Sequence, residues 1–164
     1  DIRAVRTEDV DALWQMMTAL DSETDFMLYE PMERGADTGR IRAAVEQTVR
    51  GDGFLWVATS DREIVGYLSA QRGGLKRIRH TAYLVIGIRK SHQNLGLGTR
   101  LFAQLDQWAR DVGVTRLELT VLCANRAARH LYEKNGFVAE GIRKNAMLVN
   151  GAYADELYMA KLIP

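Results

Sequence analysis

Several residue types are scarce in this chain, and each scarcity excludes a class of structure. Among 164 residues there are one cysteine, two prolines and three histidines. The lone cysteine, Cys123, excludes an intrachain disulfide and fits a reducing compartment. The histidines lack the spacing of metal ligands, so no metal site is predicted. With prolines only at positions 31 and 164, long helices and strands can run without interruption.

Long apolar runs and large charge imbalances are also missing. No stretch approaches the roughly 18 apolar residues of a membrane span, and no signal-peptide pattern opens the chain, so we expect a cytoplasmic protein. The net charge of +1 gives no reason to expect nucleic acid as a partner. The composition, 47% hydrophobic and 26% charged, is that of a globular protein. Without linkers or repeats, residues 1–164 are predicted to form a single domain.

The periodicity of apolar residues predicts strands and helices in a mixed order. Thr7 is expected to cap a helix that begins at Glu8, and residues 81–88 form the most continuous apolar run, as in a central strand. Strands are predicted at 2–6, 54–59, 63–71, 81–88, 116–121, 138–143 and 153–161, and helices at 8–20, 38–50, 96–112 and 125–135. This order, β-α-α-β-β-β-α-β-α-β-β, indicates an α/β fold with a mixed, twisted sheet of about seven strands and helices on both faces.

Two glycines precede the clearest helix of the chain, directly after the predicted central strand. Gly96 and Gly98 stand two positions apart there, and without side chains they let the backbone come close to a ligand. The amides of the first turn of a helix have no hydrogen-bond partners within the helix, so they can bind a phosphate group. A dinucleotide fingerprint would need a third glycine where Leu101 stands, and a Walker A loop would need Lys after Gly98. Gln93, Gly96 and Gly98 do match the pattern Q/R-x-x-G-x-G/A.

A second motif about 30 residues later makes the first one specific. Asn125, Ala128, Tyr132, Gly136 and Phe137 fit the pattern N-x-x-A-x-x-x-Y-x-x-x-G-F. Together the two motifs resemble the GNAT superfamily of N-acetyltransferases, over roughly residues 54–162, and the C-terminal part is similar to a bacterial branch that acts on free amino acids. The resemblance implies an acetyltransferase with acetyl-CoA as acyl donor and a small amine as acceptor.

The resemblance also assigns expected roles to residues of this sequence. The pantetheine arm would pair with the backbone of Ile86 and Ile88, and a backbone N–H there would stabilise oxyanion charge. Tyr132 would be the catalytic acid that protonates the departing thiolate, and Asn125 would contact CoA. By the same resemblance, the loop expected to bind the CoA pyrophosphate comprises Gln93, Asn94, Leu95, Gly96, Leu97, Gly98 and Thr99.

The general base is left open by the sequence. The predicted fourth strand lacks the glutamate that many relatives carry there, so Glu118, Tyr83, His80 and a water chain remain as alternatives. A polyamine or a protein N-terminus is the alternative acceptor, and a non-catalytic CoA-binding module is the alternative function.

The acceptor is expected to contact two parts of the chain. The irregular stretch 21–37 mixes apolar residues with acids, and the closing hairpin near Asn150 and Gly151 carries Arg143. This mixture favours a free amino acid over a polyamine, because an amino-acid site needs a cation for the carboxylate. A homodimer is left open.

Overall fold

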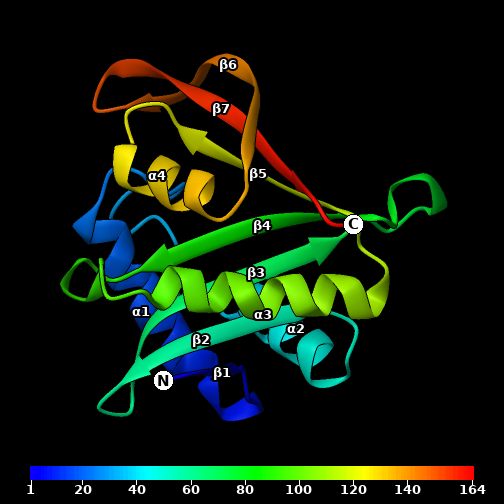
Figure 1. Cartoon of the computed structure of the whole chain (residues 1–164). Helices are drawn as coiled ribbons and strands as arrows, with labels where there is room; N and C mark the ends of the chain where they lie inside the picture. The colour runs from blue at the N-terminus through cyan, green and yellow to red at the C-terminus, as the bar shows by residue number, and fades with distance from the viewer. The chain divides into compact units, whose positions relative to one another are not determined.

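The computed structural model describes residues 1–164, and its elements follow the predicted order. The strands are β1 (Ile2–Ala4), β2 (Phe54–Ser60), β3 (Glu63–Arg72), β4 (Thr81–Ile88), β5 (Arg116–Leu122), β6 (Val138–Val149) and β7 (Ala152–Leu162). The helices are α1 (Val10–Glu23), α2 (Gly39–Val49), α3 (Leu97–Val112) and α4 (Arg126–Lys134), with 3₁₀ turns η1 (Thr7–Asp9), η2 (Lys76–Ile78) and η3 (Lys90–His92). Figure 1 shows these elements along the chain.

The seven strands form one mixed sheet in the order β1-β2-β3-β4-β5-β7-β6. Strands β4 and β5 pair in parallel, whereas β1–β2, β2–β3, β5–β7 and β6–β7 are antiparallel. The α/β fold class predicted from the sequence is therefore confirmed. Residues 1–71 and 85–108 form one compact unit, called unit 1, and residues 72–84 and 109–164 form unit 2. The prediction of a single domain stays a prediction.

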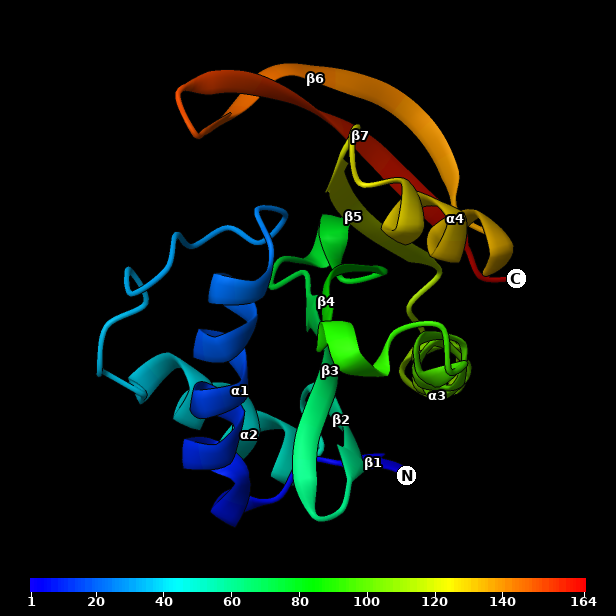
Figure 2. The same cartoon turned by 90° about the vertical axis from the view of Figure 1, so that its left-hand side faces the viewer.

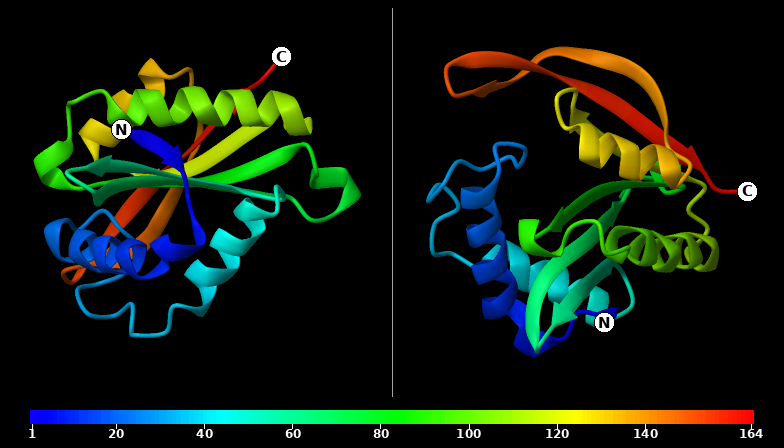
Figure 3. Two further views of the ribbon diagram at one scale, coloured as in Figure 1. Left: turned by 90° about the horizontal axis from the view of Figure 1, so that it is seen from below. Right: turned by 60° about the vertical axis from the view of Figure 1, so that its left-hand side comes forward.

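Unit 1 has helices on both faces of its strands. Figure 2 shows α1 and α2 on one side of β2 and β3 and α3 on the other, and the left view of Figure 3 shows the same layers from below. Helix α3 has an apolar stripe at helical spacing, in which Leu101 and Leu105 are fully buried. The turn at Asp61 and Arg62, both with positive φ, joins β2 to β3 as predicted.

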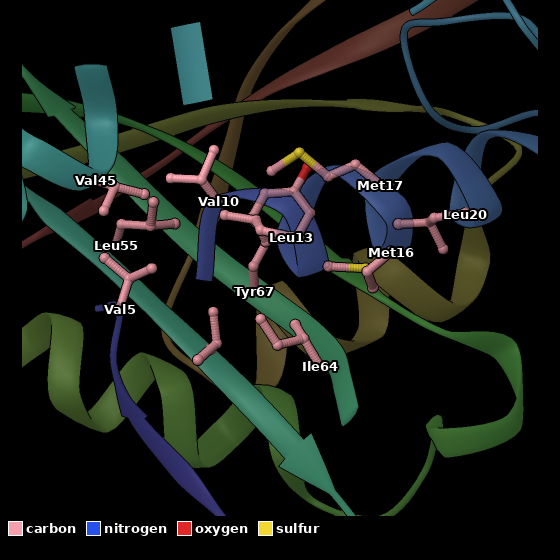
Figure 4. Packing of buried hydrophobic residues seen from close by; sticks show 11 residues of the cluster. Val5, Val10, Leu13, Met16, Met17, Leu20, Val45, Leu55, Ile64 and Tyr67 are labelled. Carbon is pink, nitrogen blue, oxygen red and sulfur yellow. The ribbon is translucent and has the colours of Figure 1, made fainter. Parts of the chain in front are cut away.

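The core of unit 1 lies between α1 and the strands β2 and β3 (Figure 4). Burial of each such aliphatic side chain stabilises the fold by about 1.5–3 kcal/mol. Trp14, expected on the apolar face of α1, is only half-buried and instead donates a hydrogen bond to the carbonyl of Gly35 at 2.9 Å. The cluster comprises Val5, Val10, Leu13, Met16, Met17, Leu20, Val45, Leu55, Val57, Ile64 and Tyr67.

Unit 2 is built on a long antiparallel register. Strand β5 pairs with β7 from Arg116 and Leu162 to Leu122 and Glu156. The β6–β7 hairpin turns at Asn150 and Gly151, with φ of 49° and 80°, as the Asn-Gly pair predicts. Helix α4 lies against β5 and β7 in the right view of Figure 3.

The predicted start of the first helix is wrong in its cap. Thr7 lies inside the 3₁₀ turn η1 and makes no side-chain capping bond. The carboxylate of Asp9 accepts a hydrogen bond from the Arg6 N–H at 2.7 Å and pairs with the Arg3 guanidinium. The pKa of Asp9 is lowered, mainly by the hydrogen bond from Arg3, so the ion pair governs this helix start.

Strand β6 is longer than predicted because a bulge lies in its middle. The prediction ended the strand at Arg143, where the alternation of apolar residues stops. The register with β7 shifts between Arg143 and Met147, and Asn145 adopts a φ of 49°. Its N–H donates to the Asp155 carboxylate at 2.9 Å, a bond that is the main cause of the lowered pKa of Asp155. The bulge therefore interrupts the sequence pattern without ending the strand.

Helix α1 extends three residues, 21–23, into the stretch that was expected to be irregular. Asp21, expected among the acids near the acceptor, is instead buried with 1% exposure. Both its oxygens accept hydrogen bonds from Arg34, at 2.8 and 3.1 Å, and the Arg34 guanidinium lies 4.4 Å from the centre of the Tyr29 ring. Asp21 thus fixes the segment after α1 to that helix.

We predict that Asp21→Asn lowers the free energy of unfolding by about 3 kcal/mol, because it leaves the largely buried Arg34 charge without its carboxylate. Urea denaturation measures this change. Glu46→Gln on the exposed face of α2 is the matched control and should change stability by less than about 0.5 kcal/mol. Equal effects of the two substitutions would contradict a structural role for the Asp21–Arg34 pair.

Candidate functional site

The glycine loop connects the end of β4 to the start of α3 within unit 1. After Ile88 the chain passes through η3 and reaches Gln93, and the first helical hydrogen bond of α3 runs from Arg100 N–H to the Gly96 carbonyl at 3.1 Å. Gly96 therefore occupies the position just before the helix, and Gly98 lies buried in its first turn. The amides of that turn have no i−4 carbonyl within the helix, which is the arrangement that binds anions.

The backbone conformation of this loop explains its residue types. Asn94 and Gly96 both adopt left-handed φ values, of 61° and 77°. Asn tolerates this region better than most residues, and Gly adopts it without strain. A Cβ at Gly96 would meet no atom within 4 Å, so the positive φ and not crowding requires glycine here. The open space beside Gly96 also leaves room for a phosphate group.

The side chain of Gln93 is engaged within the loop. Its Nε2 donates to the carbonyl of Ile88 at 3.2 Å, which links the loop back to the end of β4. On the β3 side of β4, the Arg89 N–H donates to the Val65 carbonyl at 2.8 Å. Gln93 therefore shapes the loop, while Asn94 and Leu95 beside it are exposed.

Strand β4 pairs with β5 over a short register only. The parallel pairs are Thr81 with Arg116, Ala82 with Leu117 and Tyr83 with Glu118. Ile86 and Ile88 lie beyond this register and are half-buried. Their position fits the expectation that their backbone groups pair with a pantetheine arm.

Asn125 and Tyr132 lie on α4, in unit 2. The Asn125 Oδ1 accepts a hydrogen bond from the Ala128 N–H at 3.2 Å, so Asn125 is the N-cap of α4. Tyr132 is buried, and its ring centre lies 6.0 Å from that of Phe137 at an interplanar angle of 58°. The ring therefore packs inside unit 2, against Phe137.

Two of the three side chains proposed as the general base line one hollow in unit 2. Tyr83 and Glu118 border a space of about 330 Å³, together with Thr120 and Tyr158, which the sequence did not suggest. The Tyr83 hydroxyl lies 2.9 Å from the Thr120 Oγ1. His80 is exposed and does not line this hollow. The remaining lining residues are Arg116, Leu119, Glu140 and Met159.

Arg116 dominates the electrostatics of this hollow. Its guanidinium donates to Glu140 through Nη1 and Nη2 and to Glu118 through Nε at 2.8 Å. The hydrogen bonds to Glu140 first, and to Glu118 second, raise the pKa of Arg116, and the same contact lowers the pKa of Glu140. Glu118 therefore reaches the hollow with one carboxylate oxygen already bonded to a cation.

No group of three or more His, Cys, Asp and Glu side chains is arranged to hold a metal ion. None of the helices combines the length and the apolar character that crossing a membrane requires.

A mixed sheet with a short parallel register, followed by a glycine turn at a helix start, is the architecture of the acyl-CoA-binding N-acyltransferases. The chain belongs to the acetyltransferase (GNAT) family, whose model matches residues 14–137. The resemblance seen in the sequence is therefore confirmed, and the enzyme class predicted, an acyltransferase, is that of the family.

Three known proteins illustrate the relationship. The chain is 36% identical over 110 residues to the L-amino acid N-acetyltransferase AaaT of Escherichia coli, a match that covers 65% of this chain and 66% of AaaT. An acetyltransferase of the GNAT family from Streptococcus pneumoniae is 30% identical and superposes with a TM-score of 0.92 over 100% of this chain and 99% of that one. The structure of yncA from Salmonella typhimurium, which contains its cofactor acetyl-CoA, shares the fold at 21% identity, with a TM-score of 0.88 over 100% of this chain and 94% of that one.

We predict that Gly96→Ala weakens acetyl-CoA binding at least tenfold, because a residue with a Cβ disfavours the φ of 77° and the loop would leave its conformation. Isothermal titration calorimetry measures the dissociation constant. Gly113→Ala, at the other end of α3, is the matched control, since Gly113 has a φ of 79° and equal open space. It should lower stability by a similar amount and leave the affinity unchanged. Unchanged affinity in Gly96→Ala would remove the loop from the binding site.

Proposed function

We propose that this protein is an acetyl-CoA-dependent N-acetyltransferase that acetylates the primary amine of a small molecule, in a ternary complex and without a covalent enzyme intermediate. The observation that carries the proposal is the loop from Gln93 to Gly98, where a left-handed glycine directly precedes α3. Membership of the acetyltransferase family supports it.

The residues of this loop fit the pyrophosphate of acetyl-CoA. The N-terminus of α3 offers amides without intrahelical partners and the positive end of the helix dipole. Gly96 leaves open space, and Gly98 places no side chain in the first turn. The proposed contacts come from Gln93, Asn94, Leu95, Gly96, Leu97, Gly98 and Thr99, with Ile86 and Ile88 along the pantetheine arm.

Acetyl-CoA supplies an activated acetyl group as a thioester. The neutral amine forms the new C–N bond, the C–S bond breaks, and the sulfur leaves with the bonding electron pair. A backbone N–H at the end of β4 stabilises the negative charge that develops on the carbonyl oxygen. The Tyr132 hydroxyl donates its proton to the departing sulfur, and Asn125 contacts the CoA.

The amine must also lose a proton before or during attack. Tyr83 and Glu118, which share one hollow, and His80 remain candidates for the base, beside a chain of waters. The Glu118 carboxylate already accepts a hydrogen bond from Arg116, and the Tyr83 hydroxyl is already hydrogen-bonded to Thr120. An amine that is already neutral can attack without a base, and the proton that its nitrogen loses as the amide forms then passes to water.

The acceptor that we propose is the α-amine of a free amino acid or a close analogue. A polyamine site needs unpaired acids, yet Asp21, Asp155 and Glu156 each pair with a cation of this chain. The Arg143 side chain is 53% exposed and contacts Glu156 at 3.4 Å. Its remaining N–H groups can therefore donate hydrogen bonds to the carboxylate of an acceptor. Apolar side chains of the segment after α1 are exposed, namely Phe26, Leu28 and Met32. The similarity to AaaT, which is named as an L-amino acid N-acetyltransferase, supports the same acceptor.

We predict that Tyr132→Phe lowers kcat by about 10²–10⁴-fold, the usual contribution of a general acid. The ring and its packing on Phe137 are retained, so the dissociation constant of acetyl-CoA should stay within twofold. Steady-state kinetics from pH 7 to 9 and calorimetry measure the two quantities. An unaltered kcat over this range would show that solvent protonates the thiolate, whereas loss of binding would show a packing role.

For the acceptor, we predict that apolar amino acids such as methionine and phenylalanine are acetylated more efficiently than spermidine or a peptide N-terminus. Release of free thiol from acetyl-CoA, measured for each amine, gives kcat/KM. If spermidine or the peptide is at least tenfold better, the amino-acid acceptor is wrong and the acetyltransferase activity stands. Binding of acetyl-CoA without turnover of any amine would instead favour the non-catalytic module.

A further inference from the structure

The last residue of α1, Glu23, contacts the chain where β4 passes into the glycine loop. Its Oε1 accepts a hydrogen bond from the Arg89 Nε, and its Oε2 accepts one from the backbone N–H of Lys90 at 3.0 Å. The Glu23 side chain is 22% exposed and the Arg89 side chain 34% exposed, so the pair is partly shielded from water. Nothing in the sequence motifs singled out Glu23, which precedes Arg89 by more than 60 positions.

This contact completes the attachment of the connection between β4 and α3. The Arg89 N–H is bonded to the Val65 carbonyl of β3, and Gln93 is bonded back to Ile88. Glu23 adds the third attachment, at the first residue of η3, and it is the only one of the three that comes from a helix. The hydrogen bond to Glu23 therefore restrains the backbone of Lys90.

Close packing brings α1 to this place. A Cβ on Gly87 would lie 2.5 Å from Leu20 Cδ2 and 2.9 Å from Tyr67 Cε1, so the last turns of α1 lie directly on β4. Leu20 and Tyr67 are both buried in the core of unit 1. The core thus fixes the position of α1, and α1 places the carboxylate of Glu23 beside Lys90.

We infer that Glu23 is a positioning residue for acetyl-CoA binding: it touches no part of the cofactor but holds the loop in the conformation that receives the pyrophosphate. The inference rests on the proposed function. Because Glu23 neutralises Arg89, it also assigns that guanidinium a structural task in place of a phosphate contact. Loss of the carboxylate leaves both the Arg89 charge and the Lys90 N–H without their partner, and the loop gains freedom that binding must then remove.

The chain offers a matched control at the opposite end of the same helix. Asp9 also joins a carboxylate to an arginine side chain, Arg3, and to a backbone N–H, that of Arg6, and it lies just before α1. Asp9→Asn therefore breaks a contact of the same chemistry in unit 1 without touching the loop. Any effect of lost stability alone should appear equally in both variants.

The experiment compares Glu23→Ala, Glu23→Gln and Asp9→Asn with the unaltered protein. Calorimetry should show acetyl-CoA bound about tenfold more weakly by Glu23→Ala, the weight of one hydrogen bond to a charged group. Glu23→Gln keeps an acceptor for the Lys90 N–H and should lose less. In turnover, KM for acetyl-CoA should rise with kcat nearly unchanged. Asp9→Asn should keep the original affinity and KM.

A second measurement needs no ligand. Hydrogen exchange of the amides of residues 90–98 should be faster in Glu23→Ala and unchanged in Asp9→Asn. This comparison tests the inference even if the two variants have the same free energy of unfolding. Unchanged acetyl-CoA affinity in Glu23→Ala, or equal loss in Asp9→Asn, overturns the positioning role while the proposed function stands. If the unaltered protein itself does not bind acetyl-CoA, the proposed function fails and the inference fails with it.

Discussion

The fixed position of the connection between β4 and α3 is the constraint on which the proposed binding site depends. A helix that presents free amides to an anion must begin at a fixed place, yet its first turn has no internal hydrogen bonds to hold it there. The surrounding structure supplies that hold through the β3 carbonyl of Val65, the Gln93 side chain and Glu23. The left-handed residues Asn94 and Gly96 then direct the chain into the helix. Each of these attachments stabilises a loop that would otherwise cost conformational entropy on binding.

Ion pairs between carboxylates and arginine or lysine side chains recur through both units. Three of the acids lie in α1 or directly before it. Asp9 pairs with an arginine of β1, Asp21 with one from the segment after α1, and Glu23 with one at the end of β4. In unit 2, Arg116 binds two glutamates, and the hairpin acids pair with Arg143 and Lys144. Loss of one partner from an exposed pair costs little stability, whereas loss of one partner from the buried Asp21–Arg34 pair leaves a largely buried charge unpaired and costs more.

Local chemistry allowed most of the fold to be predicted. The Asn-Gly pair at 150–151 acts through backbone conformation that neighbouring residues determine, and its turn was predicted correctly. The cap at Thr7 was wrong because the Asp9–Arg3 pair offered the Arg6 N–H a stronger partner. The end of β6 was placed too early because a bulge shifts the alternation of apolar and polar residues. A prediction from a regular period reads such a shift as the end of the strand.

The sequence by itself determined the family, the element order and the loop that we assign to acetyl-CoA, because glycines, caps and apolar periods act over a few residues. It also named Tyr83 and Glu118 as candidates for the base without being able to place them. Only the tertiary structure decided that these two share a hollow, that Asp21 is buried and that Glu23 holds the start of the loop. Each of these contacts joins residues from different elements, and ion pairs and packing across such distances in the chain leave no periodic trace in the sequence.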